Sequence, residues 1–293
     1  MSTEWRFDAI GTRWEIQTSR PLDAAERETV ARTVERFDAA WSRFRPDSVV
    51  SALGREPGAV AAPPDTVAML DAFAEASAAT AGAVNPLVGA SLDALGYDAE
   101  ISLRAGAPVA APADWRRLLT WDERMLRLSA PAVIDVGALG KGRLVDRVLN
   151  AVGEFGDGDD IVVDASGDLT VRGATVRVGL EHPFDPTRAI GVWEVCDQAL
   201  CASATNRRAW GDGLHHVLDA RTGAPVRTVV ATWAVAPEAM LADAAATALF
   251  FDGGAALCAQ WGVAWVRMLS DGRVEYSPDC PAELFTRGTT VEG

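Results

Sequence analysis

Cysteine and histidine are scarce in this chain of 293 residues, which has four cysteines and three histidines. The cysteines show no CxxC spacing, and two of the histidines, His215 and His216, are adjacent. Zinc sites and disulfide-stabilised folds need such residues in characteristic clusters. The sequence therefore argues against a zinc site and against a disulfide scaffold.

Positive charge and long apolar runs are also lacking. Lysine and arginine number 27 against 41 acidic residues, which gives a formal net charge of -14. That balance argues against a nucleic-acid partner and against an anionic membrane. No run of about 18 apolar residues is present, and the first residues, Met-Ser-Thr-Glu-Trp-Arg, do not resemble a secretion signal. We therefore expect a cytoplasmic protein with no membrane partner.

The composition is that of a globular protein, with 49% hydrophobic and 23% charged residues. Strand-like segments are interleaved with a few long helical segments and several hairpin-like returns, which favours α+β over a doubly wound α/β fold. We expect a single domain over residues 1–293, a compact globule with a mixed or antiparallel sheet. The tail beyond about residue 281 is expected to be loosely ordered.

Periodicity predicts the main elements. The expected helices are Pro21–Phe44, Pro63–Ala81 with Gly82 as its C-cap, a helix from about Lys141, and Pro237–Phe251. Strands are expected in Trp5–Thr18, Ile161–Asp164, Thr175–Glu181, Ile190–Val195, Ala199–Ala202, Thr228–Val235, Ala264–Leu269 and Val274–Tyr276, and one ending at Val136.

The Ala-rich helix predicted for Pro237–Phe251 carries the first candidate site. Asp243 and Thr247 are four residues apart, so they share one helical face. A carboxylate and a hydroxyl among alanines leave space for a hard cation such as Mg²⁺, which prefers oxygen ligands. The alternative is a solvated Asp and a Thr whose hydroxyl bonds back to the helix.

A Gly-rich turn between Asp135 and Arg143 carries the second candidate site. Its glycines permit close backbone approach, and Lys141 stands where a helix begins, with unpaired N–H groups. This arrangement is typical of an anion cradle, although such turns also occur without a ligand. It is not the nucleotide-binding GxxxxGK[ST] motif, because Gly142 follows the lysine.

Arg43 and Arg45, near a Pro-Asp turn, are either phosphate contacts or a solvated helix end. The two adjacent histidines lie on a strand-like segment, so they point to opposite faces and at most one faces a given site.

Together, these motifs occur in the order found in the ApbE-type flavin transferases, and the chain resembles that family from about Ile10 to Gly254. The segments that carry the resemblance are Ile10–Thr12, Ser42–Ser48, Asn85–Gly89, Asp135–Gly142 with Asp146, Ser166–Asp168, Glu181–Pro183, Ser203, His216–Pro225 and Ala242–Thr247.

The resemblance implies a Mg²⁺-dependent enzyme that moves the FMN half of FAD onto a Ser or Thr hydroxyl of a flavin-accepting protein and releases AMP. It implies that Asp243, Thr247 and the carbonyl of Gly140 hold the metal, and that His216 and Lys141 are catalytic. The residues expected near FAD are Gly11, Thr12, Gly140, Lys141, Asp146, Gly167, Asp168, Glu181, Ser203 and Asn206. The alternatives are a Mg²⁺-dependent FAD pyrophosphatase and a non-catalytic FAD-binding protein.

The chain departs from the family pattern around the ligand rather than at the metal. Asn206 stands where an aromatic residue is common, which leaves the stacking partner of the flavin or adenine ring open. Trp210 is the alternative candidate. Asp219 and Arg221 are expected to hold the turn after His216.

Overall fold

A nine-stranded sheet forms the centre of the computed structural model, which describes residues 2–156, 160–285 and 288–291. Its neighbouring strands are antiparallel except for the last pair, which is parallel. In spatial order the strands are β1 (Thr3–Ala9), β2 (Thr12–Thr18), β6 (Ile161–Asp164), β7 (Asp168–Arg172), β10 (Ala199–Ala204), β15 (Val229–Ala236), β16 (Ala264–Leu269), β17 (Val274–Tyr276) and β19 (Gly288–Thr290).

Smaller sheets and ribbons accompany it. One contains β18 (Glu283–Leu284), β9 (Ala189–Cys196) and β8 (Thr175–Glu181), and another contains β3 (Gly58–Ala61), β5 (Met125–Leu128) and β4 (Leu119–Trp121). Two-stranded ribbons join β11 (Ala209–Trp210) to β12 (Leu214–His215) and β13 (Leu218–Asp219) to β14 (Ala224–Pro225).

The described helices range from one turn to about five turns. They are α1 (Ala24–Trp41), α2 (Val49–Arg55), α3 (Thr66–Ala79), α4 (Gly89–Ala94), α5 (Trp115–Leu118), α6 (Gly140–Gly153), α7 (Ala239–Ala248) and α8 (Gly254–Trp261). None of the helices in the described residues is long and apolar enough to span a bilayer.

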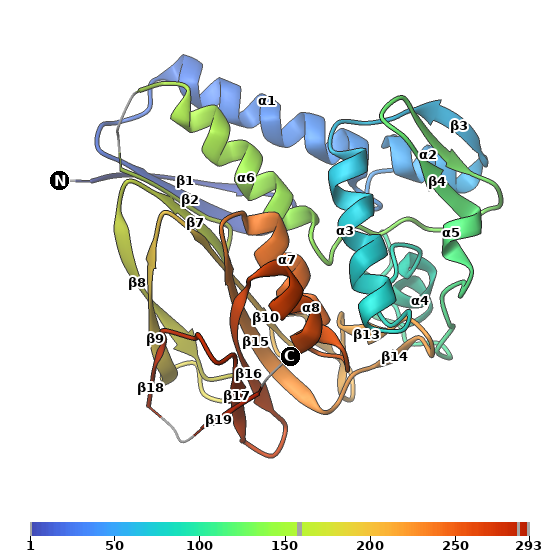
Figure 1. The fold of residues 1–293 in the computed structure, drawn as a ribbon. Helices are drawn as coiled ribbons and strands as arrows, with labels where there is room; N and C mark the ends of the chain where they lie inside the picture. The colour runs from blue at the N-terminus through green and yellow to red at the C-terminus, as the bar shows by residue number, and fades with distance from the viewer. Residues whose placement is uncertain (1, 157–159, 286–287, 292–293) are drawn as a thin grey trace.

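The elements form layers (Figure 1). Helices α1, α6 and α7 pack on one face of the main sheet through a cluster that includes Trp14, Val30, Leu144 and Ala242. The β8–β9–β18 sheet covers the other face, where Trp193 is buried. Because both faces are covered, β6 is buried at three successive positions. The α+β prediction with a large, mainly antiparallel sheet is confirmed.

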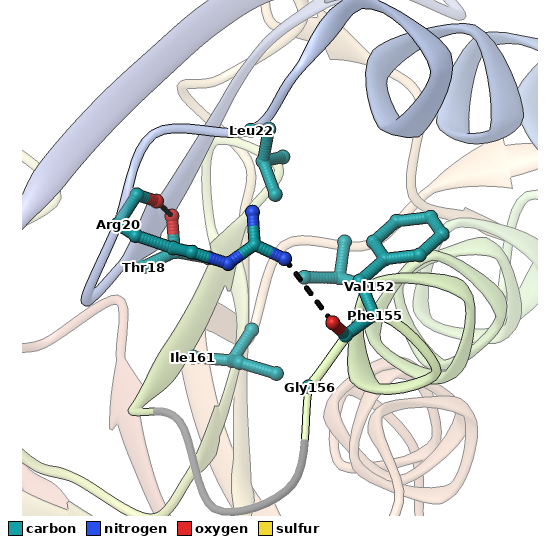
Figure 2. A pocket seen from close by; sticks show the side chains of 7 residues that line it. All are labelled: Thr18, Arg20, Leu22, Val152, Phe155, Gly156 and Ile161. Atoms are coloured by element: carbon teal, nitrogen blue, oxygen red, sulfur yellow. Dashed lines mark hydrogen bonds between the residues drawn. The ribbon is translucent and has the colours of Figure 1, made fainter.

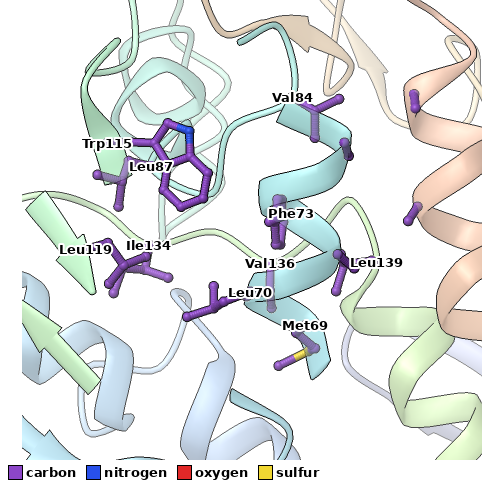
Figure 3. Packing of buried hydrophobic residues seen from close by; sticks show 14 of the residues in the cluster. Met69, Leu70, Phe73, Val84, Leu87, Trp115, Leu119, Ile134, Val136 and Leu139 are labelled. Carbon is purple, nitrogen blue, oxygen red and sulfur yellow. The ribbon is translucent and has the colours of Figure 1, made fainter. Parts of the chain in front are cut away.

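A second subregion lies beyond α7, built from α2–α5 and the β3–β5–β4 sheet (Figure 1). Its interior is the cluster drawn in Figure 3, in which Met69, Leu70 and Phe73 of α3 face Leu87, Trp115 and Leu119. Side chains of α7, Met240 and Ala244 among them, belong to the same cluster. Helix α7 therefore contacts both subregions and lies at the junction between them.

Helix boundaries differ from the sequence expectation for local reasons. Helix α1 begins at Ala24 rather than at Pro21, because Asp23 and Glu26 form a reciprocal capping box. Helix α3 ends at Ala79, and the chain leaves it through Ala81 at a φ of 52°. The predicted C-cap at Gly82 is therefore wrong, since Gly82 lies past the cap and donates to the Ser77 carbonyl.

Two further expectations differ from the structure. The segment 132–136 forms no strand; Ile134 and Val136 instead pack directly into the cluster of Figure 3. In the tail, β18 pairs with β9 and β19 pairs with β17, where loose order was expected beyond residue 281. These short, polar segments gain their order from strand partners, which composition does not reveal.

Candidate active site

The N-terminus of α6 lies directly against α7 because Gly142 has no side chain. A Cβ on this residue would lie 2.8 Å from the Cβ of Asp243 and closer still to the Ala239 carbonyl oxygen. The Gly142 N–H donates to Asp243 Oδ2 at 2.9 Å. One of the free N–H groups of the helix start is therefore satisfied by the carboxylate predicted to bind metal.

Asp146 fixes the same helix pair from the other side. Its two oxygens accept from the N–H groups of Ala239 at 2.7 Å and Met240 at 3.0 Å. This contact explains why α7 begins at Ala239 rather than at Pro237. Burial raises the pKa of Asp146 to about 6. Asp146 was predicted to lie near the dinucleotide, but the contacts in the structure are those of a helix cap.

Lys141 and two aspartates form a buried charged cluster. Lys141 Nζ lies 3.2 Å from Asp168 Oδ2, and Asp168 is 1% exposed. Burial lowers the pKa of Lys141, but the negative charges of Asp168 and Asp243 outweigh it and leave the pKa raised. Burial and the charge of Asp168 raise the pKa of Asp243. One lysine faces two carboxylates here, and a further cation beside them would favour the ionised form of Asp243.

The oxygen atoms around this cluster fit a hard cation. Asp168 Oδ1 has no hydrogen-bond partner among the described residues, and Asp168 Oδ2 is paired with the Lys141 ammonium. Thr247, one turn after Asp243, donates to the Ala138 carbonyl at 3.2 Å, so Gly140 lies between two contacts with α7. The described residues contain no group of three or more His, Cys, Asp and Glu side chains able to hold a metal. Carbonyl, hydroxyl or substrate oxygens would have to complete the set.

A tight turn, Ser166–Gly167, lies between this buried cluster and the surface. Gly167 has a φ of 116°, and a Cβ there would lie 3.9 Å from Lys141 Nζ. An open hollow of about 590 Å³ borders the turn, and it is lined by Asp8, Gly11, Thr12, Arg13 and Ser166. Three predicted ligand-binding residues, Gly11, Thr12 and Gly167, therefore lie at or beside one opening.

Strand β10 carries Ser203 along the inner side of the turn. Ala202 N–H donates to the Gly167 carbonyl at 2.7 Å, and Ser203 stands opposite Thr232 of β15. Cys201, two residues earlier, pairs with Asp168 across the sheet, and its thiol donates to the Ala239 carbonyl at 3.3 Å. Sequence reasoning missed Cys201. The alternation along β10, which puts it on the face of Ser203, was the available signal.

His216 follows β12 and lies near enough to Lys141 for their charges to interact. Burial, followed by the positive charge of Arg208, lowers the pKa of His216 to about 3, so the ring is neutral near pH 7. Its Nδ1 is inaccessible and has no hydrogen-bond partner among the described residues. His215 is buried, and its Nε2 lies 2.9 Å from the Val226 carbonyl, which is a structural contact.

Glu181 and Asn206 lie at the edge of the site with partners of their own. Glu181 pairs with Arg207 at 2.9 Å, and the Asn206 amide donates to the Pro183 carbonyl at 2.7 Å. Trp210, the alternative aromatic, is buried and stacks on Tyr97 with ring centroids 5.5 Å apart. One face of the Trp210 ring is therefore already covered.

Arg43 is a structural arginine rather than a phosphate contact. It is buried and bonds to Asp93, Asp135 and the Tyr97 carbonyl. Arg45 is surrounded by carboxylates, at 2.7 Å from Glu35 and 3.1 Å from Asp47. The structure supports neither alternative for Arg43, because it is neither solvated nor open to a ligand.

Arg221 pairs with Asp219 at 2.6 Å, so the expectation that these two residues hold their turn is confirmed.

A second, much smaller pocket is separate from this cluster (Figure 2). It lies at the opposite end of α6, where Val152 and Phe155 face Leu22 and Ile161. Arg20 crosses it and donates to the Phe155 carbonyl at 3.1 Å. Its lining is largely apolar, and it contains none of the predicted site residues.

The geometry defines an α+β protein with a buried Lys–Asp cluster at a helix N-terminus. Residues 10–265 match the model of the ApbE family, and the chain belongs to that family. A curated relative, the FAD:protein FMN transferase of Rhodobacter capsulatus, is 29% identical over 305 residues. That alignment covers 95% of this chain and 57% of the relative, so the chain spans little more than half of that protein's length.

Solved structures share the fold. The ApbE protein of Thermotoga maritima superposes with a TM-score of 0.83 at 23% identity, covering 95% of this chain and 97% of that one. The flavin transferase ApbE of Vibrio cholerae gives a TM-score of 0.78 at 21% identity, with the same coverage. The flavinyl transferase ApbE of Pseudomonas stutzeri gives 0.77 at 19% identity, covering 92% of this chain and 91% of that one.

Proposed function

We propose that this protein is an FAD:protein FMN transferase, which moves the FMN half of FAD to a Ser or Thr hydroxyl of another protein. Membership of the ApbE family and the name of the Rhodobacter capsulatus relative support this activity. The observation that carries it is the cluster of Lys141, Asp168 and Asp243 at the α6 N-terminus, beside an open hollow. A helix N-terminus and a lysine together suit a pyrophosphate.

Mg²⁺ is part of the proposal, held by Asp243, Thr247 and the Gly140 carbonyl. The fit rests on the all-oxygen donor set and on the buried Asp168 Oδ1, which has no hydrogen-bond partner among the described residues. When bound, the ion would supply positive charge against the phosphate oxygens of FAD. Lys141 would neutralise part of the same charge from its fixed position beside Asp168.

His216 would take the proton of the attacking hydroxyl. The hydroxyl oxygen bonds to the phosphorus of the FMN half, the bond from that phosphorus to the bridging oxygen breaks, and AMP leaves with the bridging oxygen. His216 is neutral, as a base must be, although a pKa of about 3 makes it a weak one. A negatively charged pyrophosphate nearby would raise that pKa toward the range in which histidine is an effective base.

Mass spectrometry of an acceptor tests the proposal. A Ser- or Thr-bearing flavoprotein is incubated with the protein, FAD and Mg²⁺, beside the Asp243→Ala variant. The matched control is Asp114→Ala, because the Asp114 side chain makes no capping bond at α5. We expect the acceptor to gain the mass of one FMN phosphodiester with wild type and the control, and no gain with Asp243→Ala or after chelation of Mg²⁺.

Other outcomes would favour the alternatives. AMP and free FMN released without any gain in acceptor mass would mean that water is the acceptor and that the protein is an FAD pyrophosphatase. Intact FAD that stays bound through the incubation would mean a non-catalytic flavin-binding protein.

A further inference from the structure

Arg208 and His216 lie at the same end of a short two-stranded ribbon. In the β11–β12 pair, Ala209 stands opposite His215 and Trp210 opposite Leu214. Arg208 directly precedes Ala209 and His216 directly follows His215, so both residues lie at the same end of the ribbon, just beyond its paired positions. The interaction of the Arg208 charge with His216 agrees with this placement.

Tyr97 fixes the Arg208 side chain. Arg208 Nη1 donates to the Tyr97 hydroxyl at 3.0 Å. The Tyr97 ring stacks on Trp210 at an interplanar angle of 19°, and Trp210 Nε1 donates to the Leu95 carbonyl at 2.9 Å. Stacking on Trp210 thus fixes the Tyr97 ring, and the hydrogen bond to the Tyr97 hydroxyl fixes the Arg208 guanidinium.

The Arg208 guanidinium has more N–H donors than the Tyr97 hydroxyl can accept from. No carboxylate lies within ion-pair distance of it in the part of the chain that the structure describes, whereas its neighbour Arg207 is paired with Glu181. A guanidinium offers several N–H donors in a planar fork, and the Tyr97 hydroxyl takes only one. Such a fork matches two oxygens of a phosphate. A partly buried arginine without a carboxylate partner is thus available to bind an anion.

We propose that Arg208 is an anion-binding residue of this site, donating to non-bridging oxygens of the FAD pyrophosphate beside His216, and that Tyr97 positions it. The inference rests on the proposed function. In the transfer step the hydroxyl proton passes to His216 and the phosphorus–oxygen bond to AMP breaks. Arg208 carries no proton in this scheme; it offsets the negative charge on the pyrophosphate as the bonds change.

Four variants test the role of Arg208. Arg208→Met removes the charge, Arg208→Lys keeps the charge without the fork, and Tyr97→Phe removes only the anchoring hydroxyl. Arg124→Met is the control for loss of one positive charge, because its exposed side chain lies on the β4–β5 turn.

We expect Arg208→Met to lower kcat/KM about 100-fold, which is typical for one lost transition-state donor. Arg208→Lys should recover part of this loss, and Tyr97→Phe should lower kcat roughly two- to tenfold. The control should stay near wild type.

Two further readouts separate an anion contact from a structural role. Affinity for FAD should fall about tenfold in Arg208→Met, whereas affinity for riboflavin, which has no phosphate, should not change. The acid limb of the pH–rate profile should move to higher pH in Arg208→Met, because His216 then accepts a proton more easily. A structural role would weaken both flavins alike and would leave the pH profile in place.

The inference is overturned if Arg208→Met keeps kcat/KM and FAD affinity within twofold of wild type. If that variant does not fold, Arg208→Lys and Tyr97→Phe decide, and wild-type values for both would overturn the inference. If the wild-type protein transfers no FMN, the proposed function fails, and the comparison of FAD with riboflavin still tests the anion contact by itself.

Discussion

Replacing Gly142 by alanine tests the contact that assembles the site. A Cβ here would meet the Asp243 Cβ at 2.8 Å and would overlap the Ala239 carbonyl oxygen. These atoms belong to the backbone of α7 or lie next to it, so no flexible side chain can move aside. Helix α7 would have to shift away from α6, which would also break the bond from the Gly142 N–H to Asp243.

Opposing effects decide how far Gly142→Ala lowers the free energy of unfolding. Alanine favours a helix over glycine by about 1 kcal/mol. Overpacking costs about 1–3 kcal/mol, and loss of a hydrogen bond to a charged group costs about 1.5–3 kcal/mol more. The net loss in the free energy of unfolding is therefore about 1.5–5 kcal/mol. This corresponds to a fall in Tm of roughly 3–20 °C for a domain of this size.

The test compares the Tm of Gly142→Ala with that of wild type and of the control variant Gly58→Ala. Gly58 is exposed in β3, and a Cβ there would meet nothing within 4 Å, so this control should unfold near the wild-type Tm. If Gly142→Ala unfolded at the wild-type temperature, helices α6 and α7 would not lie as close as the structure has them, and the argument for the metal site would fall with it.

Three other outcomes are expected. Arg43→Met should lower the free energy of unfolding by about 3–5 kcal/mol in urea titrations, because Asp135 loses its buried partner; a change below about 1 kcal/mol would contradict this. The unfolded state binds a proton at His216 between pH 6.5 and 3 and the folded state does not, so stability falls as the pH falls through this range. From pH 6 to 5, wild type should therefore lose about 1 kcal/mol more than His216→Gln in the same titrations, and equal slopes would contradict the lowered pKa. Iodoacetamide should label exposed Cys196 in the folded protein and spare Cys201, whose thiol is buried with a raised pKa; mass spectrometry showing equal labelling would refute that burial.

Much of the fold was readable from periodicity, and the failures have local causes. The strands Ile161–Asp164, Thr175–Glu181 and Ala264–Leu269 match the prediction to the residue, since each alternates or is continuously apolar between turns. The apolar segment 132–136 was expected to be a strand but has no strand partner, because its side chains fill a core between helices instead. Apolar character predicts that a segment is buried, but it does not predict which element packs against the segment.

The parts of the site that depend on residues close together in the sequence could be predicted. Asp243 and Thr247 share a helical face, and Lys141 begins a helix, as their sequence neighbourhoods indicate. The pairing of Lys141 with Asp168 depends on how α6 packs against β7, and the structural role of Arg43 depends on carboxylates 50 and 92 residues away. Contacts of this kind are set by the tertiary fold, so a single sequence does not reveal them.

The close approach of α6 and α7 also bears on when the protein becomes competent during synthesis. The bond from Gly142 to Asp243 spans 101 residues, and the cap from Asp146 to Ala239 spans 93. A nascent chain that has exposed α6 but not α7 has the lysine without the opposing helix that carries Asp243 and Thr247. If the proposed function holds, flavin binding by an unfinished chain is therefore disfavoured until α7 has left the ribosome.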